Sequence, residues 1–179
     1  MQRTRLVFSG SGGQGVITAG IFLAEAAVLY EGLTAVQTQT YGAAARGGSA
    51  RSDVIISTEK INYPKVVQPN ILICLTQEAC NRYVGILRPG GLLLTDSRLV
   101  RLERKVDAVV RQLPMYQTVM DVIGKPIVLN ICVLGALIGL AGIVKENSLK
   151  KVMRNRLRPE FLDMNQRALQ LGIDLAKDA

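Results

Sequence analysis

Short apolar runs alternate with longer amphipathic or apolar segments along the first two thirds of the chain. The run at residues 5–9 (RLVFS) is typical of a buried strand, and the Ala-, Leu- and Ile-rich segment 16–30 after it predicts a helix. Thr and Val enrichment and short runs of Ile or Leu indicate further strands downstream. The strands expected from these patterns are residues 5–9, 33–41, 49–57, 70–75, 92–94 and 106–110.

The last third of the chain has only helical patterns. Thr76 is suited to cap an earlier helix, Asn147 or Ser148 to cap a basic one, and Pro159 to open the final helix, which we expect to end near Gly172. The expected helices are residues 16–30, 77–87, 115–123, 127–143, 148–157 and 159–172. This order predicts one α/β domain over residues 1–179. We expect it to be Rossmann-like, with a mostly parallel sheet flanked by helices and an all-helical C-terminal segment.

One segment is long and apolar enough to raise the question of a membrane. Residues 127–144 carry no charge and lie between Lys125 and Lys145, so their length is borderline for a transmembrane helix. Asn130 and three glycines interrupt the segment, and an α/β pattern precedes it. We therefore expect no membrane span, and interpret the segment as a helix buried in the core or in a subunit interface.

Charge and composition restrict the partners. The formal net charge is +8, which suits an anionic ligand or an acidic protein surface. Aromatic residues make up 4% and Trp is absent, so we expect no nucleic-acid binding and interpret the basic segment 145–158 as a solvated face or a subunit contact. A second basic patch that can meet an acidic partner consists of Arg98, Arg101, Arg104 and Lys105.

Histidine is absent, and with it the commonest general base and transition-metal ligand. Cys74, Cys80 and Cys132 show no C-x-x-C spacing, so this chain is not expected to hold a metal or an iron–sulfur cluster by itself. We expect three buried free thiols. The odd count, together with the lack of a recognisable secretory signal, favours a cytoplasmic protein.

The glycine cluster FSGSGGQGV offers a binding site for an anion. Gly10, Gly12 and Gly15 fit G-x-G-x-x-G, with a strand before and a helix after, so the backbone can approach a pyrophosphate at a helix start. Ser11, Gly13 and Gln14 complete the candidate site. A dinucleotide site also needs an acidic residue at the end of the second strand, but residues 37–41 (QTQTY) contain none. NAD is therefore disfavoured, and a simple tight turn remains the alternative to anion binding.

A second cluster, YGAAARGG at residues 41–48, follows the second expected strand. Arg46 has the planar fork that suits phosphate or carboxylate, and Gly47 and Gly48 allow close backbone approach. We expect the two clusters to lie at the same sheet edge and to share one anion site that includes Tyr41. A solvated surface turn is the alternative.

Together these motifs resemble the gamma subunit of the 2-oxoacid:ferredoxin oxidoreductases over nearly the whole chain. The stretch 124–137 places Asn130 and Gly135 as that family does, and Asn165 with Gly172 is similar to its closing helix. Ala43 and Ala44 replace the usual Pro-Glu of the second cluster. The matching motifs are GSGGQG, YGAAARGG, SARSDVIIS, INYPKV, NILICLTQEA, GKPIVLNICVLGAL and NQRAL.

The resemblance implies a subunit of an enzyme that converts a 2-oxoacid to acyl-CoA and CO2 and passes electrons to ferredoxin. It implies that thiamine diphosphate, Mg²⁺ and iron–sulfur clusters reside on alpha, beta and ferredoxin-like delta subunits, while this chain contributes part of a coenzyme A site and no catalytic residue. The form of the motifs is most like the 2-oxoglutarate branch, with pyruvate and branched-chain 2-oxoacids as alternatives. An independent NAD(P)-binding oxidoreductase, with Arg46 on a 2′-phosphate, and a purely structural subunit are the competing hypotheses.

The first prediction concerns Arg46. In the assembled enzyme, Arg46→Ala is expected to raise the apparent KM for coenzyme A, because a phosphate loses its charged partner, and to leave the 2-oxoacid-dependent thiamine chemistry largely intact. Steady-state kinetics with each substrate varied in turn measure both effects. Unchanged coenzyme A kinetics would remove Arg46 from the site. The isolated chain is expected to bind the coenzyme only weakly, because part of the pocket lies on partner subunits.

Overall fold

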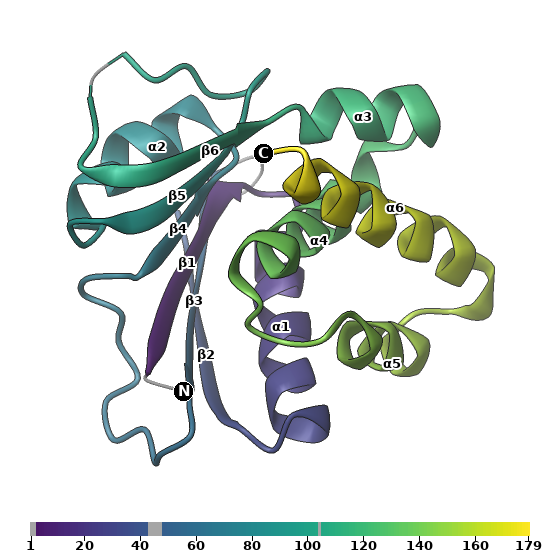
Figure 1. Ribbon diagram of the computed structural model, residues 1–179, viewed down its shortest axis with the longest axis horizontal. Coiled ribbons are helices and arrows are strands. Elements are labelled where there is room, and N and C mark those ends of the chain that lie inside the picture. Colours follow the sequence, from purple (N-terminus) through teal and green to yellow (C-terminus); the bar gives the residue numbers. More distant parts are fainter. Residues whose placement is uncertain (1–2, 43–47, 104) are drawn as a thin grey trace.

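Six strands form one mixed sheet in the order β2-β3-β1-β4-β5-β6 (Figure 1). The computed structural model describes residues 3–42, 48–103 and 105–179. Apolar positions on β1, β4 and β5 are buried on both faces, as expected of strands in the middle of a covered sheet. The strands are β1 (Thr4–Ser11), β2 (Thr34–Tyr41), β3 (Ser49–Ser57), β4 (Ile71–Cys74), β5 (Gly91–Asp96) and β6 (Ala108–Leu113).

The sheet is mostly parallel, as predicted, but one strand runs the other way. Strands β1, β4, β5 and β6 pair in parallel, whereas β3 pairs antiparallel with both β1 and β2. Only residues 42–48 separate β2 from β3, which is enough for a hairpin and too short for a parallel crossover. Strand β3 therefore lies between β1 and β2, the two strands that the first helix connects.

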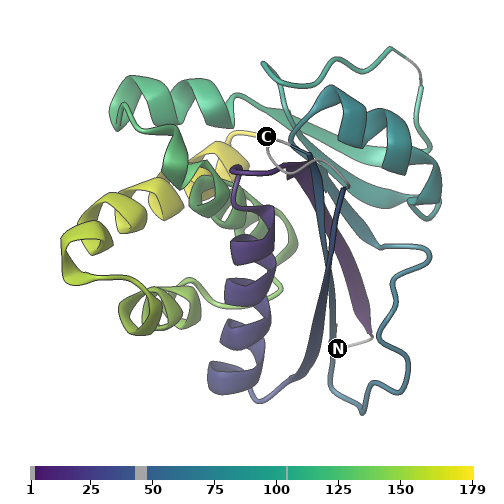
Figure 2. The same ribbon diagram turned by 180° about the vertical axis from the view of Figure 1, so that it is seen from behind.

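The helices cover the two faces unequally. Figures 1 and 2 show α1, α4, α5 and α6 on one face of the sheet and α2 on the other. Each face has its own cluster of buried apolar side chains. The helices are α1 (Val16–Tyr30), α2 (Gln77–Tyr83), α3 (Met115–Val122), α4 (Leu129–Ala141), α5 (Glu146–Arg156) and α6 (Pro159–Lys177), with short 3₁₀ turns η1 (Val84–Ile86) and η2 (Pro126–Val128).

The long apolar segment is the central helix of the thicker layer. Every α4 residue from Leu129 to Ile138 is buried, and its neighbours are α1 and α6 of the same chain. The segment is thus apolar because its own fold encloses it, and the suggestion that it forms a subunit interface is wrong for these positions. No helix within the described residues is long and apolar enough to cross a membrane.

Helices α4 and α6 touch through their backbones at two glycines. A Cβ atom on Gly172 would overlap the carbonyl oxygen of Cys132 and lie 2.6 Å from the backbone nitrogen of Ala136. A Cβ atom on Gly135 would likewise overlap the carbonyl oxygen of Leu169. The prediction that α6 ends near Gly172 is therefore wrong, because this glycine permits a close helix crossing and the helix continues to Lys177.

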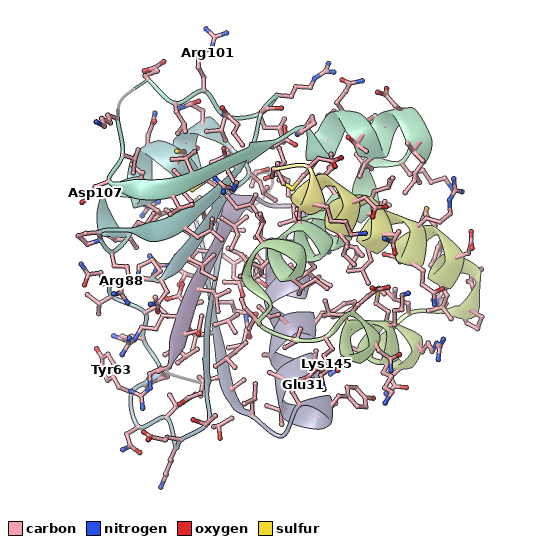
Figure 3. The ribbon with its side chains drawn as sticks, viewed as in Figure 1. Glu31, Tyr63, Arg88, Arg101, Asp107 and Lys145 are labelled. Carbon is pink, nitrogen blue, oxygen red and sulfur yellow. The ribbon has the colours of Figure 1, made fainter. Side chains whose placement is uncertain are left out.

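Glu31 ties the end of α1 to the start of α5. Its Oε1 accepts hydrogen bonds from the backbone nitrogen of Lys145 at 2.9 Å and from Ser148 Oγ at 2.5 Å, and Figure 3 shows Glu31 beside Lys145. The Ser148 hydrogen bond, more than any other interaction, lowers the pKa of the Glu31 carboxyl. The prediction that Asn147 or Ser148 caps this helix is therefore wrong. Helix α5 begins earlier, at Glu146, and the Ser148 hydroxyl bonds to Glu31 at the end of α1.

The second prediction tests the helix crossing. Gly172→Ala is expected to lower the free energy of unfolding by about 1–3 kcal/mol, because the added methyl group forces α4 and α6 apart. Gly85→Ala is the matched control, since no atom lies within 4 Å of the position of its new Cβ and its φ is not left-handed. Urea unfolding of the purified chain measures both. Equal stability of the two variants would contradict the close crossing.

Candidate functional site

The loop between β1 and α1 lies at the topological switch point of the sheet, where the strand order reverses. Strands β2 and β3 lie on one side of β1, and β4, β5 and β6 lie on the other. In open α/β sheets, ligands bind outside the carboxyl ends of the strands at such a switch point. The first glycine cluster, residues 10–15, occupies this position.

The two glycine clusters meet at this edge, as predicted. The backbone nitrogen of Gly12 donates to the carbonyl oxygen of Gly48 at 2.7 Å, and Ser11 pairs with Ser49 across β1 and β3. The cause is the antiparallel pairing of β1 with β3, which sets the end of one strand opposite the start of the other. Arg46 and Gly47, two of the predicted site residues, lie outside the described residues.

Gln14 holds the first loop in shape from within. Its Oε1 accepts from the backbone nitrogen of Ser11 at 2.8 Å, and its Nε2 donates to the carbonyl oxygen of Leu75 at 3.1 Å. A Cβ atom on Gly10 would collide with the Gln14 side chain, so Gly10 makes room for this brace. Both residues therefore position the loop, and neither lines the large cavity beside it.

The available donors lie at the start of α1. Within the described part of the chain, no backbone acceptor is paired with the N–H groups of Gly13, Gly15 or residues 16–18 in the first turn of α1. Gly13 and Gly15 have φ of 94° and 70°, a left-handed backbone that favours glycine. The first turn of α1 has no acidic residue, so the positive end of its dipole is not neutralised there. This arrangement suits an anion.

A cavity of about 510 Å³ opens beside these donors. Its lining residues come from α1, from η2 and the start of α4, and from the start of α6. Tyr41 and four residues of the first glycine cluster also line it, namely Ser11, Gly12, Gly13 and Gly15. The walls are mainly apolar, and the side chains of Tyr41, Ile127 and Phe161 remain exposed. The volume is typical of sites for small molecules and cofactors. The cavity thus combines an apolar chamber with backbone donors that are suited to an anion.

Two buried asparagines are among the polar residues that line this cavity. Asn130 and Asn165 line it and are each 7% exposed. Asn130 Nδ2 donates to the carbonyl oxygen of Gly15 at 3.3 Å, and Asn165 Nδ2 donates to that of Phe161 at 2.8 Å. Neither was among the predicted site residues. The signal for Asn130 was its place as the single amide in an uncharged apolar run.

The Asp96 carboxylate and the cysteine thiols, the groups most capable of chemistry, are buried elsewhere. Asp96, at the end of β5, is fully buried and accepts hydrogen bonds from the backbone nitrogens of Arg98, Leu99 and Tyr116, so it anchors the start of α3. Burial, with a smaller contribution from Asp96, raises the pKa of Cys132 to about 12.

The other two thiols, those of Cys74 and Cys80, are also buried, and neither forms a disulfide bond. The hydrogen bond with Cys80, and then burial, raise the pKa of Cys74 well above its usual value. Thiols with raised pKa are poor nucleophiles at neutral pH. Across the described ranges, no three His, Cys, Asp or Glu side chains are grouped to hold a metal ion. The described site is therefore equipped to bind and orient a ligand.

Comparison with known proteins gives consistent results. Residues 5–175 match the family described as pyruvate ferredoxin/flavodoxin oxidoreductase. The chain is 40% identical to the 2-oxoglutarate synthase subunit KorC of Methanocaldococcus jannaschii, over 98% of this chain and 95% of that one.

Two solved structures have the same fold. The keto/oxoacid ferredoxin oxidoreductase gamma subunit from Geobacter sulfurreducens has a TM-score of 0.87 at 39% identity, covering 98% of this chain and 99% of that chain. The 2-oxoglutarate:ferredoxin oxidoreductase from Magnetococcus marinus, solved with 2-oxoglutarate, coenzyme A and succinyl-CoA bound, has a TM-score of 0.90 at 26% identity, covering 100% of this chain and 32% of that chain.

The third prediction separates backbone strain from crowding in the glycine cluster. Gly13→Ala and Gly15→Ala each force a side chain into the left-handed region, which costs about 1–2 kcal/mol. Only Gly15→Ala also crowds Asn130, whose Nδ2 would lie 2.6 Å from the new Cβ, so it should cost about 1–3 kcal/mol more. Urea unfolding measures the free energies.

A double-mutant cycle with Asn130→Ala tests the cause of this difference. In that background, Gly15→Ala should lose most of its extra cost over Gly13→Ala, because the amide is gone and only the Cβ atom of residue 130 remains, at 3.0 Å. If the extra cost of Gly15→Ala persists without Asn130, the contact between this amide and the start of α1 is not its origin.

Proposed function

The chain belongs to the pyruvate ferredoxin/flavodoxin oxidoreductase family as the gamma subunit of a 2-oxoacid:ferredoxin oxidoreductase, and we propose that it forms the phosphate-binding part of that enzyme's coenzyme A site. The family and the class of enzyme expected from the sequence motifs are confirmed. The observation that carries the proposal is the set of N–H groups at the start of α1, which faces a ligand-sized cavity without an acidic residue in its first turn.

Coenzyme A carries anionic groups of the kind that the N–H groups at this edge of the sheet can bind. Its pyrophosphate and 3′-phosphate are anions, and helix starts with unpaired N–H groups bind such groups. The similarity to a structure that was solved with coenzyme A bound supports the same assignment. Within the site, Gly13 and Gly15 supply backbone donors, Ser11 adds a hydroxyl group, and Gly12 and Gly48 form the junction of the two loops. Arg46, Gly47 and Tyr41 remain predicted contacts of the same anion.

The sheet order argues against the NAD(P) hypothesis. In a dinucleotide-binding βαβ unit, the second strand lies directly beside the first and ends in the acidic residue that binds the ribose. Here β3 separates β2 from β1, and β2 ends in TQTY without a carboxylate. The glycine cluster therefore has no adjacent second strand that ends in an acidic residue, which is the feature that binds the ribose of a nicotinamide dinucleotide.

The reaction is the oxidative decarboxylation of a 2-oxoacid to acyl-CoA and CO2, with electrons passed to ferredoxin. Thiamine diphosphate with Mg²⁺ supplies the decarboxylation chemistry and iron–sulfur clusters supply electron transfer, and we assign both to the alpha, beta and delta partners. The role of this chain is to bind the anionic part of coenzyme A and aim the rest at the partner subunit. Similarity to 2-oxoglutarate synthase subunits supports 2-oxoglutarate as the substrate.

The fourth prediction places a negative charge at the start of α1. Thr18 is exposed, lines the cavity and lies in the first turn. In the assembled enzyme, Thr18→Glu is expected to raise the Kd for coenzyme A about tenfold, which corresponds to about 1.4 kcal/mol, because the carboxylate repels the phosphates. The same carboxylate should stabilise the isolated chain by about 0.3–1 kcal/mol through the helix dipole.

Thr18→Gln is the matched control, because it has the size of the glutamate without its charge. Calorimetric titration with coenzyme A and urea unfolding of the chain measure the two effects. A lower affinity for coenzyme A together with a higher stability of the chain in Thr18→Glu, relative to Thr18→Gln, identifies an electrostatic effect on the ligand. Equal affinity of the Glu and Gln variants would show that no phosphate lies near the start of α1.

A further inference from the structure

The sheet ends on one side in a strand with an open outer edge. Strand β6 is the last of the order and pairs with β5 (Figure 1). The carbonyl oxygen of Leu113 accepts a hydrogen bond from the backbone nitrogen of Ser97, just after β5, so it points toward β5. Because backbone groups alternate in direction along a strand, those of Val110 and Gln112 point outward. Among the described residues, no acceptor is paired with either outward N–H group.

Arg111 places a positive charge on this edge. Its Nη1 donates to the carbonyl oxygen of Val110 at 3.2 Å, which is one of the outward-pointing groups. Charged side chains on an edge strand hinder its pairing with an identical strand, because two copies bring like charges together. A strand that carries carboxylates neutralises the charge instead. The edge therefore disfavours a second copy of this chain and suits an acidic strand.

The connection between β5 and β6 adds further positive charge next to this edge. Its basic side chains are exposed at three described positions, namely Arg98, Arg101 and Lys105. Figure 3 shows Arg101 extending away from the body of the protein and apart from the acidic Asp107. Within the described ranges, neither these three residues nor Arg111 forms an ion pair with a carboxylate. We call β6 together with these four basic residues the basic edge.

The basic patch predicted from the sequence is therefore exposed in the fold, apart from Arg104, which lies outside the described residues. The other basic segment, residues 145–158, differs because the fold itself supplies carboxylates. Its ion pairs are those of Lys145 with Glu31, Lys150 with Glu146, and Arg156 with Glu25. The basic edge has no such carboxylates among the described residues, so an acidic partner can provide them.

The connection is fixed in place without a partner. The backbone nitrogen of Arg101 donates to Gln77 Oε1 at 2.8 Å, which ties the connection to the start of α2. Gln112 Nε2 donates to the carbonyl oxygen of Val100 at 2.7 Å, which ties it to β6. Binding at a surface that is already ordered costs little conformational entropy. The basic edge is thus prepared for docking.

We propose that an extended segment of a partner subunit, rich in aspartate and glutamate, adds to the sheet beside β6. Main-chain hydrogen bonds to Val110 and Gln112 supply affinity, and the side chains of the basic edge select the acidic sequence. Val109, which is 48% exposed, offers an apolar contact. The proposal concerns the assembly of the enzyme and does not depend on the coenzyme A site.

The first test reverses the charge of the basic edge. Arg101→Glu combined with Lys105→Glu should raise the Kd of this chain for the remaining subunits about tenfold at low salt. The difference from wild type should shrink as salt screens the charges. Titration of the fluorescently labelled chain with the other subunits, followed by anisotropy, measures the Kd.

Arg154→Glu combined with Arg158→Glu is the matched control. Both residues are exposed, neither forms an ion pair among the described residues, and the change in net charge is the same. Equal effects of the two double variants would mean that only net charge matters, and would overturn the proposal.

Amide hydrogen exchange tests the addition of a strand. In the isolated chain, the N–H groups of Val109 and Arg111 point toward β5 and should exchange slowly, whereas those of Val110 and Gln112 should exchange fast. In the assembled enzyme, exchange at Val110 and Gln112 should slow at least about tenfold. Mass spectrometry with electron-transfer fragmentation resolves the alternate residues. Unchanged exchange at these two amides contradicts strand addition even if the charge variants lower the affinity.

Carbodiimide coupling identifies the occupant, because it joins an amine directly to a carboxylate in contact with it. In the assembled enzyme, Lys105 should couple to an aspartate or glutamate in an acidic segment of another subunit, and peptide mass spectrometry locates the bond. Coupling of Lys105 only within its own chain, or to a second copy of this chain, would rule out the acidic partner strand.

Discussion

The close backbone contact between α4 and α6 determines where the binding site lies. At Gly135 and Gly172 the two helices approach more closely than any side chain allows, and this contact fixes their relative direction and register. Because the helices run the same way, both begin on the side where α1 begins, at the edge of the sheet. Three positive helix ends and two buried carboxamides thereby surround one cavity. A looser crossing would leave the proposed anion site at α1 without the chamber beside it.

The sheet contributes the second constraint. The antiparallel pairing of β3 with β1 brings the start of β3 to the end of β1, so the two glycine clusters share an edge although one follows β1 and the other precedes β3. The same insertion separates β2 from β1 and removes the geometry of a dinucleotide site. The position of β3 between β1 and β2 thus brings the two glycine loops together. It also disfavours a nicotinamide dinucleotide, the commonest ligand of the G-x-G-x-x-G pattern.

The sequence predicted most elements because their signals are local. Helix α1 and strand β3 have the predicted bounds, since a run of Ala, Leu and Ile and a run of β-branched residues each specify one structure within a few turns or pairs. The membership of the gamma-subunit family was also predictable, because the two glycine clusters and the motif around Asn130 resemble the motifs of that family. Gly15 was assigned correctly to the start of α1 for the same local reason.

What the sequence did not predict depends on contacts between distant residues. Gly172 looked like a helix end because glycine usually ends helices, whereas its true reason is the carbonyl of Cys132 on another helix. Ser148 looked like a cap, whereas its hydroxyl bonds to Glu31, far away in the sequence. For Gln14, the sequence predicted a contact with the anion but not that both ends of its amide brace the loop. Asn165 had no local signal for the site, because its place at the cavity follows from the crossing of α4 and α6.

No reactive group was found among the described residues of the site, which agrees with our proposal that the chemistry occurs on neighbouring subunits. The thiols Cys74 and Cys132 are buried with raised pKa, and the one fully buried carboxylate, that of Asp96 among the described residues, anchors a helix. A subunit that binds the unreactive end of a large substrate still affects the rate, because binding energy from remote groups offsets the cost of positioning the reacting atom. Coenzyme A has a long unreactive nucleotide tail and a single reacting sulfur atom, so the two tasks are separable in space. On this reasoning, a chain without a general base or a metal ligand set in its described site can control how the thiol is presented to a cofactor that it does not itself hold.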